Sequence, residues 1–159
     1  MLSLQLDEAF DLLGQVIGDM APDQYEWRPP GNANPVSKLH VHTLTSVDFW
    51  VNAMALGLPL LWPDVAKKTG LPGNAIKIWE TDTPIPLLDI SQYAARLQSA
   101  TVPPIAALTE GALRDMRDLP FFGQRDVAFA LRLAALQLAT HTGEISATKG
   151  LQGLKGLPY

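Results

Sequence analysis

Cysteine is absent from this chain of 159 residues, so it has no disulfide framework, no thiolate nucleophile and no cysteine-based metal site. Basic residues are few and form no cluster: 12 lysines and arginines stand against 16 acidic residues, for a net charge of -4. This balance argues against a nucleic-acid partner. Long apolar runs are also missing, because Asn52, Gly57 and Pro59 interrupt residues 51–62, a stretch too short to span a bilayer.

The chain length indicates one domain, residues 1–159. Residues 1–8 are acidic and contain no positively charged segment, so we expect no signal peptide and a cytoplasmic location. A hydrophobic content of 47% is enough to build a core. No segment alternates apolar and polar residues with the period of two that is typical of strands. We therefore expect an all-α protein.

Four segments show the apolar spacing of amphipathic helices, as Leu6, Phe10, Leu13 and Ile17 do in the first of them. Asn34 followed by Pro35 favours the start of the second helix. The expected helices cover residues 3–19, 35–56, 89–108 and 124–149, with connections at 22–35 and 111–123. Residues 57–88 contain five prolines and form a long irregular crossover between the second and third helices. The expected fold is a four-helix bundle.

The candidate site lies in the fourth expected helix. Gln137, His141 and Glu144 are four and three residues apart, so a helix places them on one face, which is otherwise apolar. Polar groups on a buried face need partners, since burial without a hydrogen bond costs about 1–3 kcal/mol each. His42, in the second helix, is the candidate partner. Either His42, Gln137 and His141 hold a divalent metal ion, or they only hydrogen-bond to each other.

The donor types favour zinc or nickel if a metal is bound, because imidazole is a good ligand for both. Gln137 and His141 have the i, i+4 spacing with which two side chains can grip one ion, although an amide oxygen is a weaker ligand than a third imidazole. Glu144, one turn beyond His141, is expected to orient an imidazole by a hydrogen bond without touching the ion, or to serve as an alternative ligand. No catalytic nucleophile or general base stands out.

Several other positions have expected placements. His40 lies two residues before His42, about 200° around a helix, so both cannot face the core, and we expect His40 on the surface. Asp48 is expected to be a surface charge or the partner of a second helix rather than a general base. Trp62 and Trp79, within the crossover, are expected to pack onto the bundle rather than to line a pocket.

Three short motifs stand out: His42 followed by Val47-Asp48-Phe49-Trp50, then His141-Thr142-Gly143-Glu144-Ile145, and Trp27-Arg28-Pro29 before the second helix. Together they resemble motifs of the DinB/YfiT-like superfamily of bacterial helical proteins. The first is similar to that family's histidine with a trailing acidic-aromatic element, the second to its His-x-Gly-Gln-Ile, and the third to its Trp-Arg-Pro loop. The order of the helices and the long crossover agree over essentially the whole chain. Gln137 stands where the family most often has histidine, and Glu144 replaces its usual glutamine.

The resemblance implies an up-up-down-down bundle with a divalent metal held by three side chains, which here are His42, Gln137 and His141. It also implies an enzyme, because members include thiol-dependent S-transferases and a mycothiol-dependent maleylpyruvate isomerase, whose metal activates a low-molecular-weight thiol. A small-molecule substrate, such a thiol as cosubstrate, and a homodimer are expected, the last because only 18% of residues are charged. The alternative is a non-catalytic small-molecule-binding or interaction protein with a degenerate metal site.

Overall fold

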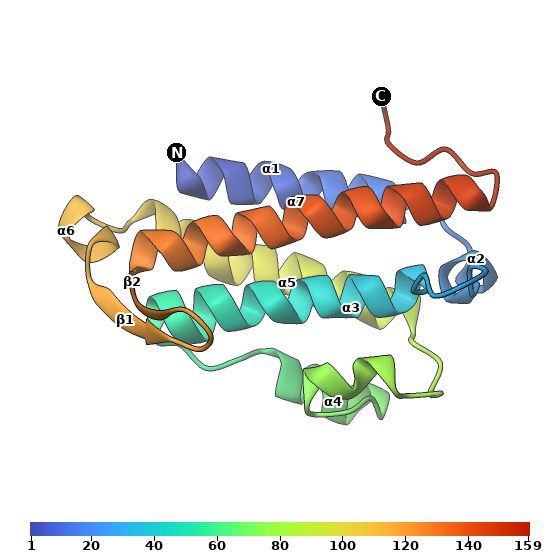
Figure 1. Ribbon diagram of the computed structural model, residues 1–159, viewed down its shortest axis with the longest axis horizontal. Coiled ribbons are helices and arrows are strands. Elements are labelled where there is room, and N and C mark those ends of the chain that lie inside the picture. The colour runs from blue at the N-terminus through green and yellow to red at the C-terminus, as the bar shows by residue number, and fades with distance from the viewer.

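Helices make up most of the protein, whose computed structural model describes residues 1–159 (Figure 1). In chain order the elements are α1 (Leu2–Ile17), α2 (Pro22–Glu26), α3 (Val36–Val47), the π-helix η1 (Asp48–Leu56), α4 (Trp62–Thr69), the 3-10 helix η2 (Ala75–Trp79), α5 (Leu87–Ala106), α6 (Glu110–Leu113), β1 (Met116–Leu119), β2 (Gly123–Asp126) and α7 (Val127–Leu151). The prediction of a mostly helical protein is confirmed. None of the helices is both long enough and apolar enough to cross a membrane.

Four long helices lie side by side: α1, α3 continued directly by η1, α5 and α7 (Figure 1). α1 and α7 run in one direction, and α3 and α5 run in the opposite direction. Lys149 near the end of α7 donates to the carbonyl of Val16 near the end of α1, as two parallel helices allow. This order differs from the expected up-up-down-down arrangement. The crossover returns the chain to the end at which α3 began, so α5 repeats the direction of α3, whereas the other two connections turn the chain back.

α3 is the most deeply buried of these helices, because α7, α5, α2 and η2 all contact it. Ten of its 12 residues are buried, including the polar side chains of Ser37, Lys38 and His40. The apolar stripes expected on the first and fourth helices are buried as well: Leu6, Phe10, Leu13 and Ile17 on α1, and Val127, Leu131, Ala134, Leu138 and Ile145 on α7. The polar groups of a buried helix need partners within the fold or in a cleft, and Oγ of Ser37 is the one buried side-chain polar atom of α3 without such a partner.

Short elements occupy segments for which the sequence predicts no regular structure. α2 lies within the expected loop at 22–35, and α4 and η2 lie within the crossover. β1 and β2 pair antiparallel, with Met116 opposite Asp126 and Leu119 opposite Gly123, so the expectation of no strands is wrong. Only Leu119 is buried in the eight paired residues, so this hairpin is too short and too exposed for an alternating pattern to reveal it.

The helix ends follow the local chemistry of the chain. η1 ends at Gly57, whose φ of +66° is the left-handed conformation that favours glycine. α7 begins after Asp126, whose carboxylate accepts a hydrogen bond of 2.7 Å from the amide of Phe129. α5 continues through Pro103 and Pro104 to Ala106. These prolines lie near the carboxyl end of α5 and do not interrupt it, so the helix ends at Ala106, close to its expected end at residue 108.

Asp48, the first residue of η1, ties the crossover to the bundle. Its side chain is fully buried, and Oδ2 accepts hydrogen bonds from the amides of Leu61 and Trp62, at 2.9 Å each, and from the hydroxyl of Tyr93 at 2.8 Å. Oδ1 accepts a further bond of 2.8 Å from Asn52. Burial, followed by the charge of Asp48, raises the pKa of Tyr93, which therefore remains a hydroxyl donor. Asp48 is thus the partner of neighbouring helices and not a surface charge.

The substitution Asp48→Asn tests this role. We expect it to lower the free energy of unfolding by about 2–4 kcal/mol, because the amides at the start of α4 and the Tyr93 hydroxyl lose a charged, buried acceptor. Urea denaturation measures the loss. Asp64→Asn is a matched control, since Asp64 is exposed and makes only a 3.8 Å ion pair, and it should cost less than about 1 kcal/mol. Equally small losses in both variants would contradict the role of Asp48.

Candidate metal centre between α3 and α7

His42 lies where α3 meets α7 and η2. Its half-buried ring has its centroid 5.0 Å from that of His141 and 4.9 Å from that of Trp79. Burial lowers the pKa of His42, the neighbouring His141 lowers it further, and Glu144 opposes both effects. The ring is therefore neutral at neutral pH, which is the form in which an imidazole nitrogen binds a metal ion.

α7 directs three polar side chains from successive turns toward this place. Nε2 of His141 lies 2.8 Å from Oε1 of Gln137, and Nδ1 lies 3.1 Å from Oε2 of Glu144. His141 and Gln137 are partly buried, whereas Glu144 is exposed to solvent. The spacing in the sequence and the folded geometry therefore agree that these side chains share one face of α7, and the fold brings His42 beside His141.

The two contacts of His141 place an oxygen atom at each ring nitrogen. An ionised carboxylate only accepts hydrogen bonds, so Nδ1 carries the hydrogen that faces Glu144. In a neutral ring Nε2 then holds a lone pair, and this lone pair faces a second acceptor, Oε1 of Gln137. Three changes would satisfy the contact: a proton on Nε2, a 180° flip of the Gln137 amide that places its NH₂ group there, or a cation shared by the two atoms. The site is therefore built to accommodate a positive charge or an amide donor next to His42.

Trp79 covers one side of His42, and Lys38 holds it there. Lys38 lies one turn before His42 on α3, is 9% exposed, and donates a 2.9 Å hydrogen bond from Nζ to the backbone carbonyl of Trp79. Trp62 packs on the bundle as expected, with its ring 5.7 Å from that of Tyr93. Trp79 packs too, but against the candidate site. Lys38 was missed by the sequence analysis, although its i, i+4 spacing from His42 is a usable signal.

His40 is buried, with an exposed fraction of 2%, so the expectation that it lies on the surface is wrong. The two histidines do point to different sides of α3, but the bundle covers both sides. Nδ1 of His40 lies 3.0 Å from the hydroxyl of Tyr25, which is itself fully buried. Burial lowers the pKa of His40 to about 3 and raises that of Tyr25, so both groups are neutral at neutral pH.

A metal ion at this site would need the amide of Gln137. No group of three or more histidine, cysteine, aspartate or glutamate side chains is arranged to hold a metal ion. His42, His141 and Gln137 would supply two imidazole nitrogens and one amide oxygen, a donor set that suits a borderline divalent cation but binds it less strongly than three imidazoles. Glu144 holds Nδ1 of His141 as carboxylates hold metal-binding histidines. The residues therefore fit a weak divalent site.

Comparisons with known proteins identify the fold. A model of the DinB superfamily matches residues 5–145 of the chain. The crystal structure of a conserved protein from Enterococcus faecalis is similar, with a TM-score of 0.80, 20% sequence identity and coverage of 94% of each chain. A DinB-like protein from Bacillus subtilis is similar with a TM-score of 0.68 and 17% identity, covering 99% of this chain and 96% of that one. No match was found among curated proteins.

The burial of His40 predicts a loss of stability in acid. The pKa of His40 is about 3 in the folded protein and about 6.5 in the unfolded chain, so only the unfolded chain takes up a proton between these values. The contribution is fully present above pH 6.5 and falls as the pH is lowered toward 3. At pH 4.5 the loss attributable to His40 is about 2.7 kcal/mol relative to pH 7.

Urea denaturation of the wild type and of His40→Gln at pH 7 and pH 4.5 measures this term. Each protein is compared with itself at the two pH values, so any loss of packing in the variant cancels. His42→Gln serves as the control for a histidine that is only half-buried, and it should remove less of the pH dependence. If wild type and His40→Gln lost the same free energy between the two pH values, the neutral, buried state of His40 would be contradicted.

Proposed function

The chain belongs to the DinB superfamily, and we propose that it is a divalent-metal-dependent enzyme in which His42, Gln137 and His141 hold the ion. The observation that carries the proposal is the 2.8 Å contact between Nε2 of His141 and Oε1 of Gln137, two atoms that can each offer a lone pair to one cation. The ring of His42 lies beside them and is kept neutral by burial. Zinc and nickel suit such ligands best.

A bound zinc or nickel ion would lower the pKa of a coordinated thiol or water and so supply a nucleophile near neutral pH. The neighbouring residues of this chain would position and shield the ligands. Glu144 keeps the hydrogen of His141 on Nδ1, so the lone pair of Nε2 is free to bind a metal ion. Trp79, held by Lys38, shields one side of His42 from water. The chain has no cysteine, so the thiol would be a low-molecular-weight cosubstrate, and the reaction an S-transfer to a small electrophile or a thiol-dependent isomerisation.

A non-catalytic binding or interaction protein is the second candidate. It is favoured by the same Gln137 to His141 contact, which satisfies both side chains without an ion if the amide is turned, and by the lack of a third histidine or carboxylate ligand. In that case the site would be a degenerate one. We also propose a homodimer, on the basis of the low proportion of charged residues, 18%.

The catalytic part of the proposal predicts consumption of thiol. Wild-type protein loaded with zinc or nickel should consume a low-molecular-weight thiol in the presence of a small electrophile, and His141→Ala should lose this activity because it removes a ligand. Free thiol is followed with a colorimetric reagent across several thiols and electrophiles. If no thiol were consumed with either metal, the thiol-dependent reaction would be contradicted.

The metal part predicts the behaviour of Gln137→His. A third imidazole should tighten binding, and metal at about 100 times its dissociation constant should add roughly 2.7 kcal/mol of stability to the variant. This corresponds to a rise in melting temperature on the order of 5–10 °C for a chain of this size. Thermal melts with and without zinc or nickel measure it. The double variant with His141→Ala should show no metal-dependent rise.

Gln5→His is the matched control, because it adds a histidine to an exposed position of α1, far along the chain from the candidate ligands. Its melting temperature should be insensitive to the metal. If Gln137 were only a hydrogen-bond partner in the core, its replacement would leave polar atoms unpaired. Gln137→His would then be less stable than the wild type by roughly 1–3 kcal/mol and would melt at a lower temperature. Added metal would not change its melting temperature.

A further inference from the structure

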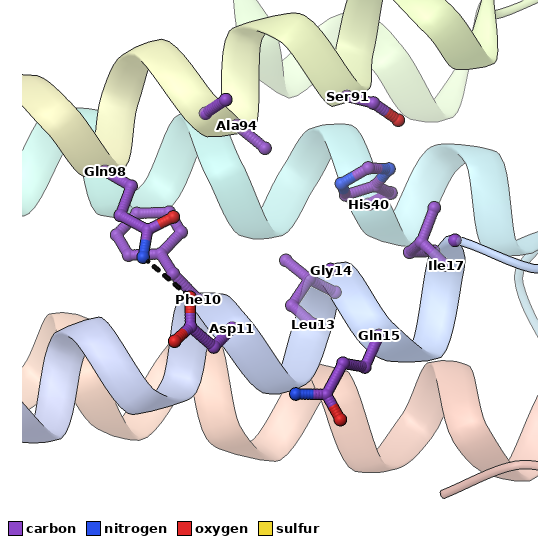
Figure 2. A pocket seen from close by; sticks show the side chains of 12 residues that line it. Phe10, Asp11, Leu13, Gly14, Gln15, Ile17, His40, Ser91, Ala94 and Gln98 are labelled. Carbon is purple, nitrogen blue, oxygen red and sulfur yellow. Dashed lines mark hydrogen bonds between the residues drawn. The ribbon is translucent and has the colours of Figure 1, made fainter. Parts of the chain in front are cut away.

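A cleft of about 440 Å³ lies between α1 and α5, on the side of α3 opposite the His42 and His141 pair. We call it the α1–α5 cleft; His40 forms its floor, and Leu13, Gly14, Ser91 and Ala94 line its walls. Figure 2 shows His40 between the two helices, with residues of α1 on one side and of α5 on the other. Its volume is within the range of pockets that hold small organic molecules.

The cleft exists because small residues face each other across it. Gly14 on α1 and Gly18 directly after it stand opposite Ser91, Ala94 and Ala95 on α5, so no large side chain fills the space between them. A Cβ atom built on Gly14 would have no heavy atom within 4 Å. At one end the helices are joined by Gln98, whose amide donates hydrogen bonds of 2.8 and 2.9 Å to carboxylates of α1. The remaining space is open to a ligand.

His40 points a polar atom into this space. Nδ1 of His40 is the one hydrogen-bond partner of the buried Tyr25 hydroxyl, at 3.0 Å. If the hydroxyl accepted this bond, its own buried hydrogen would have no acceptor, so we assign the hydroxyl as the donor. Nε2 of His40 then carries a ring hydrogen, and it has no partner in the protein. The only buried side-chain polar atoms without a partner are Oγ of Ser37 and Oδ1 of Asn52. Nε2 is therefore not sealed in the core, and the α1–α5 cleft is the opening that His40 lines.

The charges around the cleft limit the type of ligand. No lysine or arginine lines it, and its one ionised side chain is the carboxylate of Asp11. A negatively charged ligand would find no counter-charge and would be repelled by Asp11. Most of the wall is apolar, with Phe10, Leu13 and Ile17 contributed by α1. A ligand with an apolar body and a single hydrogen-bond acceptor would match this surface.

We propose that the α1–α5 cleft binds a small uncharged molecule that has an apolar body and a carbonyl or hydroxyl oxygen, and that this oxygen accepts a hydrogen bond from Nε2 of His40. The site is separate from the proposed metal centre, because His40 and His42 lie on different sides of α3. Occupancy of the α1–α5 cleft would therefore proceed with or without a metal ion at His42.

NMR titration of the full chain tests the proposal, because its three histidines can each be assigned from their ring signals. Acetophenone is the probe with a carbonyl oxygen, ethylbenzene lacks the acceptor, and benzoate carries a negative charge. Acetophenone should shift the His40 ring and the Leu13 methyl signals saturably and leave His42 and His141 unmoved. Ethylbenzene should bind about threefold to tenfold more weakly, since it forgoes one hydrogen bond. Benzoate should not bind.

Gly14→Leu should abolish the saturable shift by filling the cleft. The variant should fold, because Cβ has free space and leucine is a better helix former than glycine. Gly150→Leu is the matched control, since this glycine also lies in a helix with no atom within 4 Å of its Cβ, and it should keep the shift. Thermal melts check that both variants are folded.

Four results would overturn the proposal. The first is no saturable shift of His40 with acetophenone, and the second is an unchanged shift in Gly14→Leu. The third is equal binding of acetophenone and ethylbenzene, which would remove the role of Nε2. The fourth is a dimer in light scattering that Gly14→Leu converts to a monomer, which would show that a second copy of the chain occupies the α1–α5 cleft.

Discussion

The buried carboxylate of Asp48 sets the position of the crossover, and the candidate site depends on that position. A buried charge is tolerated when every lone pair is matched, and here two amides at the start of α4, the Tyr93 hydroxyl and the Asn52 amide provide the donors. With α4 fixed, the chain reaches η2, where Lys38 holds the carbonyl of Trp79. Trp79 then covers His42. The crossover is thus a wall of the site rather than a free loop.

α3 separates two environments that each contain one histidine. On one side His42 faces α7, and its neighbours His141, Gln137 and Glu144 form a chain of polar contacts that ends in solvent. On the other side His40 pairs with Tyr25 below the α1–α5 cleft. One helix can serve both because nearly all its residues are buried, and most of its polar side chains have specific partners, with Oγ of Ser37 as the exception. The same burial makes His40 sensitive to acid, while His42 stays partly accessible.

Local spacing accounts for the parts that the sequence predicted. The 3.6-residue period locates the long helices within a few residues and places Gln137, His141 and Glu144 on one face. The helix directions, the burial of His40 and the role of Asp48 could not be predicted in this way, because they depend on segments distant in the chain. The donors to Oδ2 of Asp48 lie 13, 14 and 45 residues beyond it. The pairing of His42 with His141 was suggested by polar groups in need of partners, whereas the metal, the substrates and the homodimer remain predictions.

The metal content of protein purified without a histidine tag tests the central claim most directly, which is that His42, Gln137 and His141 together bind a divalent cation. Elemental analysis after equilibration with zinc or nickel, which a weak site requires, should find a stoichiometric amount of the ion in the wild type and none in His141→Ala. The two proteins differ by one ligand, so the comparison also excludes metal bound elsewhere on the chain. A wild-type protein without metal, or one whose metal content equals that of His141→Ala, would contradict the account.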